Sequence, residues 1–303
     1  MNANNTNSIS FFIHFHLRNS MTLFLSMGII ALAACSSAPK NQGEIYDLRN
    51  RAESRLEQGN KLADQGSLEA ALVFLEEAFQ FAVMSDDPSL RVRTNLSRSN
   101  VLFSLGRRDE AVSGWDKALD EAVQMGNREL IAICRIHSNR GKLLSSAGTT
   151  EAQSIRDEVS RDLAQIKSDQ LYVAFAWMVV GLAEKELGHF AQAETAMRRS
   201  LNIHEKERNF ELAAYDWFLI ASFRSLSGNY TGAQQALEMA IDYDRRVENS
   251  WGLANDWRAL GDVYKKAGNR EASRSAYIRA AEIFRAAGFE EVAEETLSRI
   301  GDT

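Results

Sequence analysis

The sequence predicts an all-α protein, built as a superhelical solenoid of about six helix–turn–helix repeats with one further helix at the C-terminus. Hydrophobic residues recur at helical spacing, as Leu68, Leu72, Leu75 and Phe79 do within one segment. No segment alternates hydrophobic and polar residues as a strand would. Small residues and turn glycines recur at a nearly constant interval, which indicates internal repeats.

Two series of residues define this interval. The first series consists of small residues in the first helix of each repeat: Gly59, Ser99, Gly141, Gly181, Ala221 and Gly261. The second consists of turn glycines: Gly66, Gly106, Gly148, Gly188, Gly228 and Gly268. Both series advance by 40, 42, 40, 40 and 40 residues. This regularity predicts one structural unit that stacks on copies of itself.

Each series has a physical reason. The residue just past a helix end commonly takes a positive φ, which glycine adopts at little cost, so the turn glycines end the first helix of each repeat. The small residues leave room for a bulky side chain from the second helix. Those bulky side chains are Leu75, Trp115, Met197, Leu237 and Tyr277. Because a single helix pair cannot bury its own apolar face, the pairs are expected to stack.

The sixth repeat carries the motif W-x2-L-G-x2-Y as Trp257, Leu260, Gly261 and Tyr264. In these residues the chain resembles the tetratricopeptide-repeat family. The resemblance extends over residues 45–287 and implies a right-handed superhelix. The period of this chain exceeds the family's commonest period of about 34 residues, which predicts longer helices or longer links.

The third repeat departs furthest from the motif. His137 stands where tryptophan is usual, and the turn at Gly148 is one residue short. The second helix of this repeat is polar around Arg156. We therefore expect a helical break or a change of curvature in this repeat.

The N-terminal segment predicts export and lipidation. Residues 1–34 contain no acidic side chain, and an apolar run that starts at Thr22 ends in two alanines before Cys35. This arrangement is typical of a signal peptide and resembles the lipobox of bacterial lipoproteins. The resemblance implies cleavage before Cys35, a diacylglyceryl group on its sulfur and usually a further acyl chain, such as palmitate, on its nitrogen.

Two alternatives to a lipoprotein signal stay open. A transmembrane helix is disfavoured because the apolar run has 13 residues, whereas about 20 are needed to span a bilayer. The cysteine could also follow an ordinary signal peptide by chance. Residues 35–44 are expected to form the lipidated cysteine and a flexible tether. Ser36, in place of Asp, resembles an outer-membrane address, so we expect a lipid-anchored protein of the bacterial cell envelope that faces the periplasm.

Beyond the tether, the sequence predicts one elongated domain. Residues 45–287 form the solenoid and contain no internal linker rich in proline, serine or glycine. Residues 288–303 form a capping helix, in which Val292, Leu297 and Ile300 cover the sixth repeat while acidic residues face water.

Composition and motifs argue against several classes of function. The chain has 35 basic and 41 acidic residues, a net charge of −6, which disfavours a nucleic-acid groove. Cys134 lies in an apolar run and is expected to be a buried core thiol. His204 and Glu205 begin like a zinc-protease motif, but Arg208 stands where the second histidine belongs. Without a phosphate loop, a nucleophile elbow or a convincing pair of carboxylates, we expect no enzyme activity, no metal and no cofactor.

The resemblance also implies a concave groove lined by the first helix of each repeat. Carried over position by position, it selects Asn60, Arg93, Asn100, Arg135, Lys142, Phe175, Met178, Leu182, Tyr215, Phe218 and Arg258. The second and third repeats supply basic and amide groups, and the fourth and fifth supply aromatic and apolar ones. Such a groove suits an extended peptide or an amphipathic helix. The alternative is that the apolar residues pack against neighbouring helices.

Together these observations predict a membrane-anchored scaffold or adaptor that binds another cell-envelope protein or peptide through its concave groove. One alternative is a receptor whose groove closes around a small molecule or a short peptide. Another is a structural lipoprotein that associates with itself to form a homo-oligomer.

Overall fold

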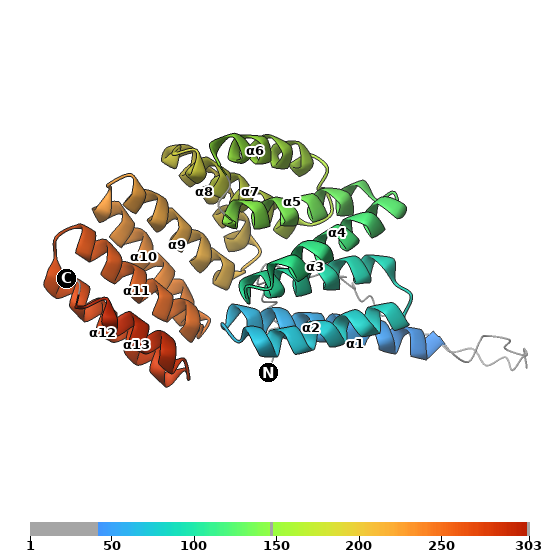
Figure 1. Cartoon of the computed structure of the whole chain (residues 1–303), viewed down its shortest axis with the longest axis horizontal. Helices are drawn as coiled ribbons and strands as arrows, with labels where there is room; N and C mark the ends of the chain where they lie inside the picture. The colour runs from blue at the N-terminus through green and yellow to red at the C-terminus, as the bar shows by residue number, and fades with distance from the viewer. Residues whose placement is uncertain (1–41, 146–147, 302–303) are drawn as a thin grey trace, which may run out of the picture.

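The computed structural model describes residues 42–145 and 148–301, so the predicted signal peptide and Cys35 lie outside the described residues. The described residues form thirteen α-helices and no strand, and consecutive helices pack against each other (Figure 1). The helices are α1 (Gln42–Asp64), α2 (Leu68–Met84), α3 (Pro88–Ser104), α4 (Arg108–Gln124), α5 (Arg128–Leu144), α6 (Thr149–Leu163), α7 (Gln170–Glu186), α8 (Phe190–Lys206), α9 (Phe210–Leu226), α10 (Tyr230–Arg246), α11 (Ser250–Lys266), α12 (Arg270–Ala286) and α13 (Glu290–Ser298). The prediction of an all-α solenoid with a C-terminal helix is confirmed. None of the described helices is both long and apolar enough to cross a membrane.

Helix length explains the repeat period. All the helices from α2 to α12 have 17 residues except α6, and three-residue links join most of them. Because these links are short, the long period comes from long helices. Many helices begin at a side chain that accepts a hydrogen bond from a backbone N–H of the first turn, which stabilises the helix start. These N-cap residues are Asp87, Asn127, Asp169, Asn209, Asn229, Asn249 and Asn269.

The turn glycines have the predicted backbone conformation with one exception. Those with φ between +75° and +81° are Gly66, Gly106, Gly188, Gly228 and Gly268. Gly148 has φ −72° and is the N-cap of α6, so the prediction of a positive-φ turn at this glycine was wrong. The link from α5 to α6 covers residues 145–148 and is one residue longer than the three-residue links, not shorter as the sequence suggested, so Gly148 falls at the start of α6 rather than just past the end of α5.

The predicted pairing of small and bulky residues holds in several repeats. A Cβ added at Gly261 would lie 2.6 Å from the Tyr277 ring, and one at Gly59 would lie 2.6 Å from Leu75. Gly141 differs, because its missing side chain makes room for Trp115 of the preceding repeat. The small residues therefore allow close contact both within a repeat and between neighbouring repeats.

The third repeat is irregular, as expected. Its second helix, α6, has 15 residues, and a link of six residues joins it to α7, which also packs against α5. Glu129 of α5 holds this link, because its Oε1 accepts hydrogen bonds from the backbone nitrogens of Lys167 and Ser168, each 2.9 Å long. The hydroxyl of Ser168 donates to the same oxygen at 2.8 Å. One carboxylate thus stabilises a segment that has no regular secondary structure.

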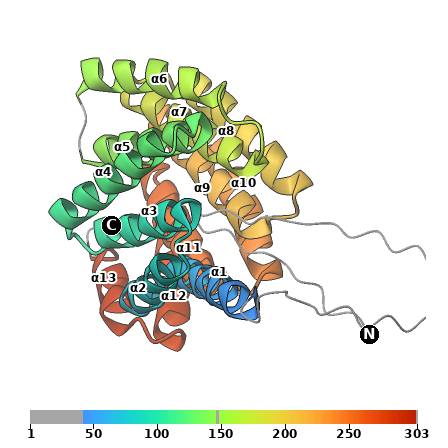
Figure 2. The same ribbon diagram turned by 90° about the vertical axis from the view of Figure 1, so that its right-hand side faces the viewer.

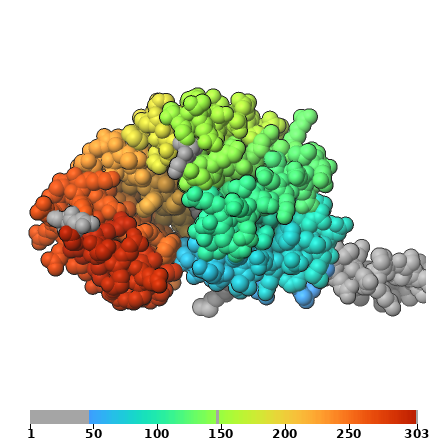
Figure 3. Space-filling model, viewed as in Figure 1, coloured from blue at the N-terminus to red at the C-terminus, as the bar shows by residue number. Residues whose placement is uncertain are grey.

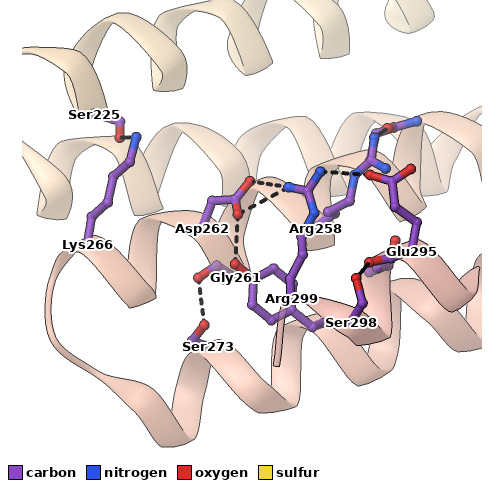
Figure 4. Close-up of polar contacts among 12 residues, drawn as sticks. Ser225, Arg258, Gly261, Asp262, Lys266, Ser273, Glu295, Ser298 and Arg299 are labelled. Carbon is purple, nitrogen blue, oxygen red and sulfur yellow. Dashed lines mark hydrogen bonds and ion pairs between the residues drawn. The ribbon is translucent and has the colours of Figure 1, made fainter. Parts of the chain in front are cut away.

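The C-terminal helix α13 is joined to the sixth repeat by polar contacts (Figure 4). Arg299, at the end of α13, donates to Asp262 of α11 over 3.1 Å and forms an ion pair with Glu295. The hydroxyl of Tyr277 donates to the other oxygen of Asp262 at 2.7 Å. Ala293 and Thr296 are fully buried, so α13 covers the apolar end of the solenoid as a cap must.

The solenoid bends so strongly that its first and sixth repeats meet. Figures 1 and 2 both place α1 and α2 beside the C-terminal helices. The contact is between the first turn and α11, where a Cβ added at Gly66 would lie 2.6 Å from the Trp251 ring. In Figure 3 the two ends face each other across a narrow hollow. We call this junction of the first and sixth repeats the seam.

Candidate functional site

The inner side of the curve is filled by the protein's own side chains in the second to fourth repeats. The indole nitrogen of Trp115 donates to Asn100 Oδ1 at 3.1 Å, and Asn100 Nδ2 lies 3.0 Å from His137 Nδ1. The His137 ring stacks on Phe175 with centroids 4.4 Å apart. All four residues are buried. This row of contacts leaves little of these side chains open to a ligand.

The predicted aromatic and apolar groove residues divide into two groups. Phe175, Met178 and Leu182 of α7 are buried in the core. Tyr215 and Phe218 of α9 are half-buried, and their rings stack with centroids 6.2 Å apart. Of these five predicted residues, Tyr215 and Phe218 are the two that line the cavity described below.

The predicted polar groove residues are spread over the curve and engage neighbours of their own chain. Arg93 pairs with Glu53 of the first repeat at 2.6 Å, and Arg135 pairs with Asp162 at 2.9 Å. Arg258 donates to Asn255 at 2.6 Å and lies over the Phe284 ring. Of the other three, Asn100 is bonded to Trp115 as described above, Asn60 is buried and Lys142 is exposed. The structure does not bring this set together in one place.

A cavity of about 300 Å³ lies at the seam, and we call it the seam pocket. Four helices and one helix-capping segment contribute to it, from the first, fifth and sixth repeats. Its lining consists of Ala63, Asp64, Glu211, Leu212, Tyr215, Phe218, Asp244, Asn249, Trp251, Gly252, Asn255 and Asp256. Two of these, Tyr215 and Phe218, were selected from the sequence. A volume of this size is at the lower end of the range of about 300–1,000 Å³ for small-ligand pockets.

Two buried carboxyl groups form one wall of the seam pocket. Asp244 of α10 is 3% exposed, and Asp256 of α11 is 2% exposed. The amide of Asn249 donates to Asp244 Oδ1 at 3.0 Å. Gly252 makes the arrangement possible, since a Cβ there would overlap Asp244 Oδ2. The pair is not apparent from the sequence, because the two aspartates lie on different helices.

The environment of this pair favours the protonated acid. Burial raises the pKa of Asp244 to about 7, and the nearby Glu211 carboxylate adds to the shift. Burial, together with the charge of Asp244, also raises the pKa of Asp256. A carboxyl group whose pKa is raised by folding stabilises the folded state below its unfolded pKa of about 4, and that contribution is lost as the pH rises through the folded pKa. The pair therefore opposes folding above about pH 7 unless a positive charge compensates it.

Another part of the pocket lining is aromatic. Tyr215 and Phe218 come from α9, and the indole of Trp251 comes from the first turn of α11. Trp251 is held by Phe284 and Phe289, whose ring centroids lie 5.3 Å and 4.7 Å from its own. Tyr215 is also fixed, because its hydroxyl is hydrogen-bonded to the buried Arg140 of α5. These rings are rigid supports for a ligand group placed against the carboxyl pair.

Other reactive residues are engaged within the core. Cys134 is buried, and burial raises the pKa of its thiol to about 12, so it is a core thiol as predicted. His204 Nδ1 lies 2.7 Å from Asp216 Oδ2, and Ser200 donates to the other oxygen of Asp216 at 3.1 Å. Within 42–145 and 148–301, no group of three histidine, cysteine, aspartate or glutamate side chains has an arrangement that could hold a metal ion.

Similar folds occur among solved structures. A Rap protein complexed with competence and sporulation factor matches 83% of this chain and 74% of its own chain, with 14% identity and a TM-score of 0.58. The APC/C hetero-tetramer Cut9-Hcn1 matches 85% of this chain, with 14% identity and a TM-score of 0.56. A signal-transduction ATPase of the STAND class with a tetratricopeptide repeat sensor, from Pyrococcus horikoshii, matches 85% of this chain, with 12% identity and a TM-score of 0.51. This chain spans 46% and 42% of the length of the last two.

These likenesses define the class of fold, a solenoid of tetratricopeptide type. At such low identity they carry no further information about activity or partners. No protein-family model and no curated protein sequence matches the chain.

Proposed function

We propose that this protein is a binding module that takes up a short segment of a partner protein, with one side chain of that segment seated in the seam pocket. The observation that carries the proposal is the pocket itself, which half-buried aromatic rings and buried carboxyl groups line together. Apolar walls with a few fixed polar groups are the usual composition of a ligand site. The similar Rap protein was solved with competence and sporulation factor bound, so a fold of this type accommodates a ligand.

The proposed partner belongs to the cell envelope, and the proposed anchor is a lipid on Cys35. A tether holds the solenoid near the membrane and raises the effective concentration of a membrane-bound partner. Two or more acyl chains suffice for stable anchoring, since each buried CH2 contributes about 0.8 kcal/mol. The outer membrane is the proposed location, with the solenoid in the periplasm.

Replacing the proposed lipid attachment site should release the protein from membranes. In Cys35→Ser, the sulfur that would carry the diacylglyceryl group is absent, so we expect loss of palmitate labelling and recovery of the protein outside the membrane fraction. Cys134→Ser is the matched control, because that thiol lies in the solenoid core. Membrane association of Cys35→Ser without any label would refute lipid anchoring.

The partner can be sought by crosslinking in intact envelopes, followed by capture of this protein. We expect Leu212→Ala/Phe218→Ala to lose one captured protein selectively, because both substitutions remove apolar surface from the seam pocket. Tyr215 is left in place because its hydroxyl is a partner of buried Arg140. The control variant is Val83→Ala/Met84→Ala, which changes exposed apolar residues on α2. Equal capture by both variants would place the contact elsewhere than the pocket.

One observation favours a second candidate function, that of a small-molecule receptor. The seam pocket is of a size for a single small molecule, and residues from both ends of the solenoid line it. A rise in melting temperature that depends on the concentration of a metabolite, and that Phe218→Ala abolishes, would support the receptor.

A further inference from the structure

We propose that the seam pocket recognises an organic ammonium cation, of the kind that a lysine side chain or a small free amine carries, on the carboxyl pair Asp244 and Asp256. This inference rests on the proposed function, since it specifies which chemical group enters the pocket. Three features carry it: a buried oxygen of Asp256 that accepts no hydrogen bond among the described residues, charged side chains in the described lining that are all acidic, and aromatic rings in the same lining.

Asp256 is the first feature. Its Oδ2 atom is buried and has no hydrogen-bond partner among the described residues. No ion pair of the described chain includes Asp244 or Asp256 either. A buried carboxylate without a donor is costly, typically by about 1–3 kcal/mol. Such atoms in folded proteins call for an explanation, and one explanation is a ligand that supplies the missing donor.

The two carboxyl groups can lie this close together in two protonation states. They are within hydrogen-bonding reach of one another if one of them keeps its proton, and this is the state that burial favours in the empty pocket. In the other state, a cation placed between them lets both ionise. Both groups line a cavity rather than solid core. A cationic ligand that enters this cavity could therefore bind between them and allow both to ionise.

The charges around the pair come from every element that lines the pocket, and all are acidic. Asp64 lies at the end of α1 and Glu211 in the first turn of α9, while Asp244 and Asp256 come from α10 and α11. Among the residues that the structure describes, no lysine, arginine or histidine lines the pocket. The described lining can therefore supply negative charge to a bound cation and no positive charge to compete with it.

The shape and the aromatic wall select the kind of cation. Rings of Tyr215, Phe218 and Trp251 are surfaces on which a cation or an alkyl stem can lie. These lining acids do not form a group of three that could hold a metal ion within the described residues. An ammonium group has three donors on a compact charge, which fits two carboxyl groups converging from different helices better than a planar guanidinium does.

The test measures binding to the full-length protein in detergent micelles by titration calorimetry at about pH 7.5, where ammonium groups are charged. The first probe is a pentapeptide with blocked termini and one central lysine, and the second is 1,4-diaminobutane. Control peptides carry norleucine or arginine in place of the lysine. Tighter binding of the lysine peptide identifies a peptide side chain as the source of the cation, and tighter binding of the diamine identifies a free amine.

Asp256→Asn and Asp244→Asn should each weaken binding of the tighter probe by about tenfold or more, because each removes a charge-assisted hydrogen bond. Asp242→Asn is the matched control, since this residue lies on the same helix with its side chain 48% exposed, and it should leave binding unchanged. The pocket variants should keep or raise the melting temperature at this pH, because asparagine removes the ionisation that opposes folding. Loss of binding therefore cannot be ascribed to loss of the fold.

The pH dependence supplies an independent readout. Affinity should increase between about pH 6 and about pH 8, because the pair must ionise to bind the cation and the pKa of Asp244 is about 7. Binding should also release protons, seen as a dependence of the measured heat on the ionisation enthalpy of the buffer. Both effects should be smaller in Asp244→Asn, where Asp256 is the one carboxyl group of the pair left to ionise.

Several outcomes would overturn the inference. These are no binding of either probe, equal binding of the norleucine peptide, preference for the arginine peptide, or no effect of the two pocket variants. A different result would refute the proposed function, namely that Leu212→Ala/Phe218→Ala still captures every protein that the wild type captures. A partner lost with that variant but retained by Asp256→Asn would uphold the function and refute the cation.

Discussion

Gly261→Leu should disrupt the sixth repeat and cost most of its stability. A Cβ at this position would lie 2.6 Å from Cδ1 and Cε1 of the buried Tyr277 ring, and the branched leucine side chain would extend further into the same space. Overpacking a core costs about 1–3 kcal/mol and occasionally more. The ring cannot move away freely, because its hydroxyl is bonded to Asp262, which also holds Arg299 of the capping segment. We expect a lower melting temperature and faster amide exchange in α11, α12 and α13.

The control for this prediction uses the equivalent glycine of the fourth repeat. A Cβ at Gly181 would lie 3.1 Å from the sulfur of Met197, whose flexible side chain can yield. Gly181→Leu should therefore be less destabilising than Gly261→Leu. Adding Tyr277→Ala to Gly261→Leu should restore part of the lost stability, since the two side chains compete for one space. Equal melting temperatures for Gly261→Leu and the wild type would show that the packing described at this position is wrong.

Gly66→Ala should open the seam. Gly66 has φ +77°, which an alanine adopts at a cost of about 1–2 kcal/mol. Its new methyl group would also overlap the Trp251 ring, at 2.6 Å. Either Trp251 moves or the two ends of the solenoid separate. We expect a fall in melting temperature and an increase in the radius of gyration measured by small-angle X-ray scattering.

Gly106→Ala isolates the contribution of the seam. Gly106 has φ +79°, nearly the same as Gly66, but no atom lies within 4 Å of the position of its missing Cβ. The two variants share the backbone strain and differ in the contact with Trp251. The extra destabilisation of Gly66→Ala should therefore be of the order of an overpacked contact, about 1–3 kcal/mol. If both variants unfold at the same temperature with the same radius of gyration, the seam does not hold the ends together.

The sequence predicted the repeated unit well because its determinants are local. The positive φ at Gly268 and the close fit of Gly261 with Tyr277 each depend on residues within one helix pair. The position of the capping helix follows from an apolar stripe at the end of the chain. The irregular third repeat was visible in the altered spacing around Gly148, although the link there is longer than the others and the glycine takes a different backbone conformation from the one predicted.

The curvature could not be predicted from local pattern, and the candidate site depends on it. The tight bend places Phe175 on His137, so residues assigned to an open groove are buried instead. The same bend brings Trp251 to the first turn and creates the pocket beside Tyr215 and Phe218. Asp244 and Asp256 belong to consecutive helices, and their distance depends on how α10 packs on α11. The one sequence feature related to this packing is Gly252, whose missing side chain leaves room for Asp244.

The contact between Gly66 and Trp251 also has a consequence for how the chain folds and unravels. In an open array, each terminal repeat has one neighbour, so unfolding can begin at either end and spread along the stack. Here the first repeat has neighbours on both sides, the second repeat and the sixth. Fraying of either terminus must first break a contact between residues far apart in the sequence. The loss of native structure on heating should therefore be more cooperative, and the last step of folding slower, than in a solenoid whose ends stay apart.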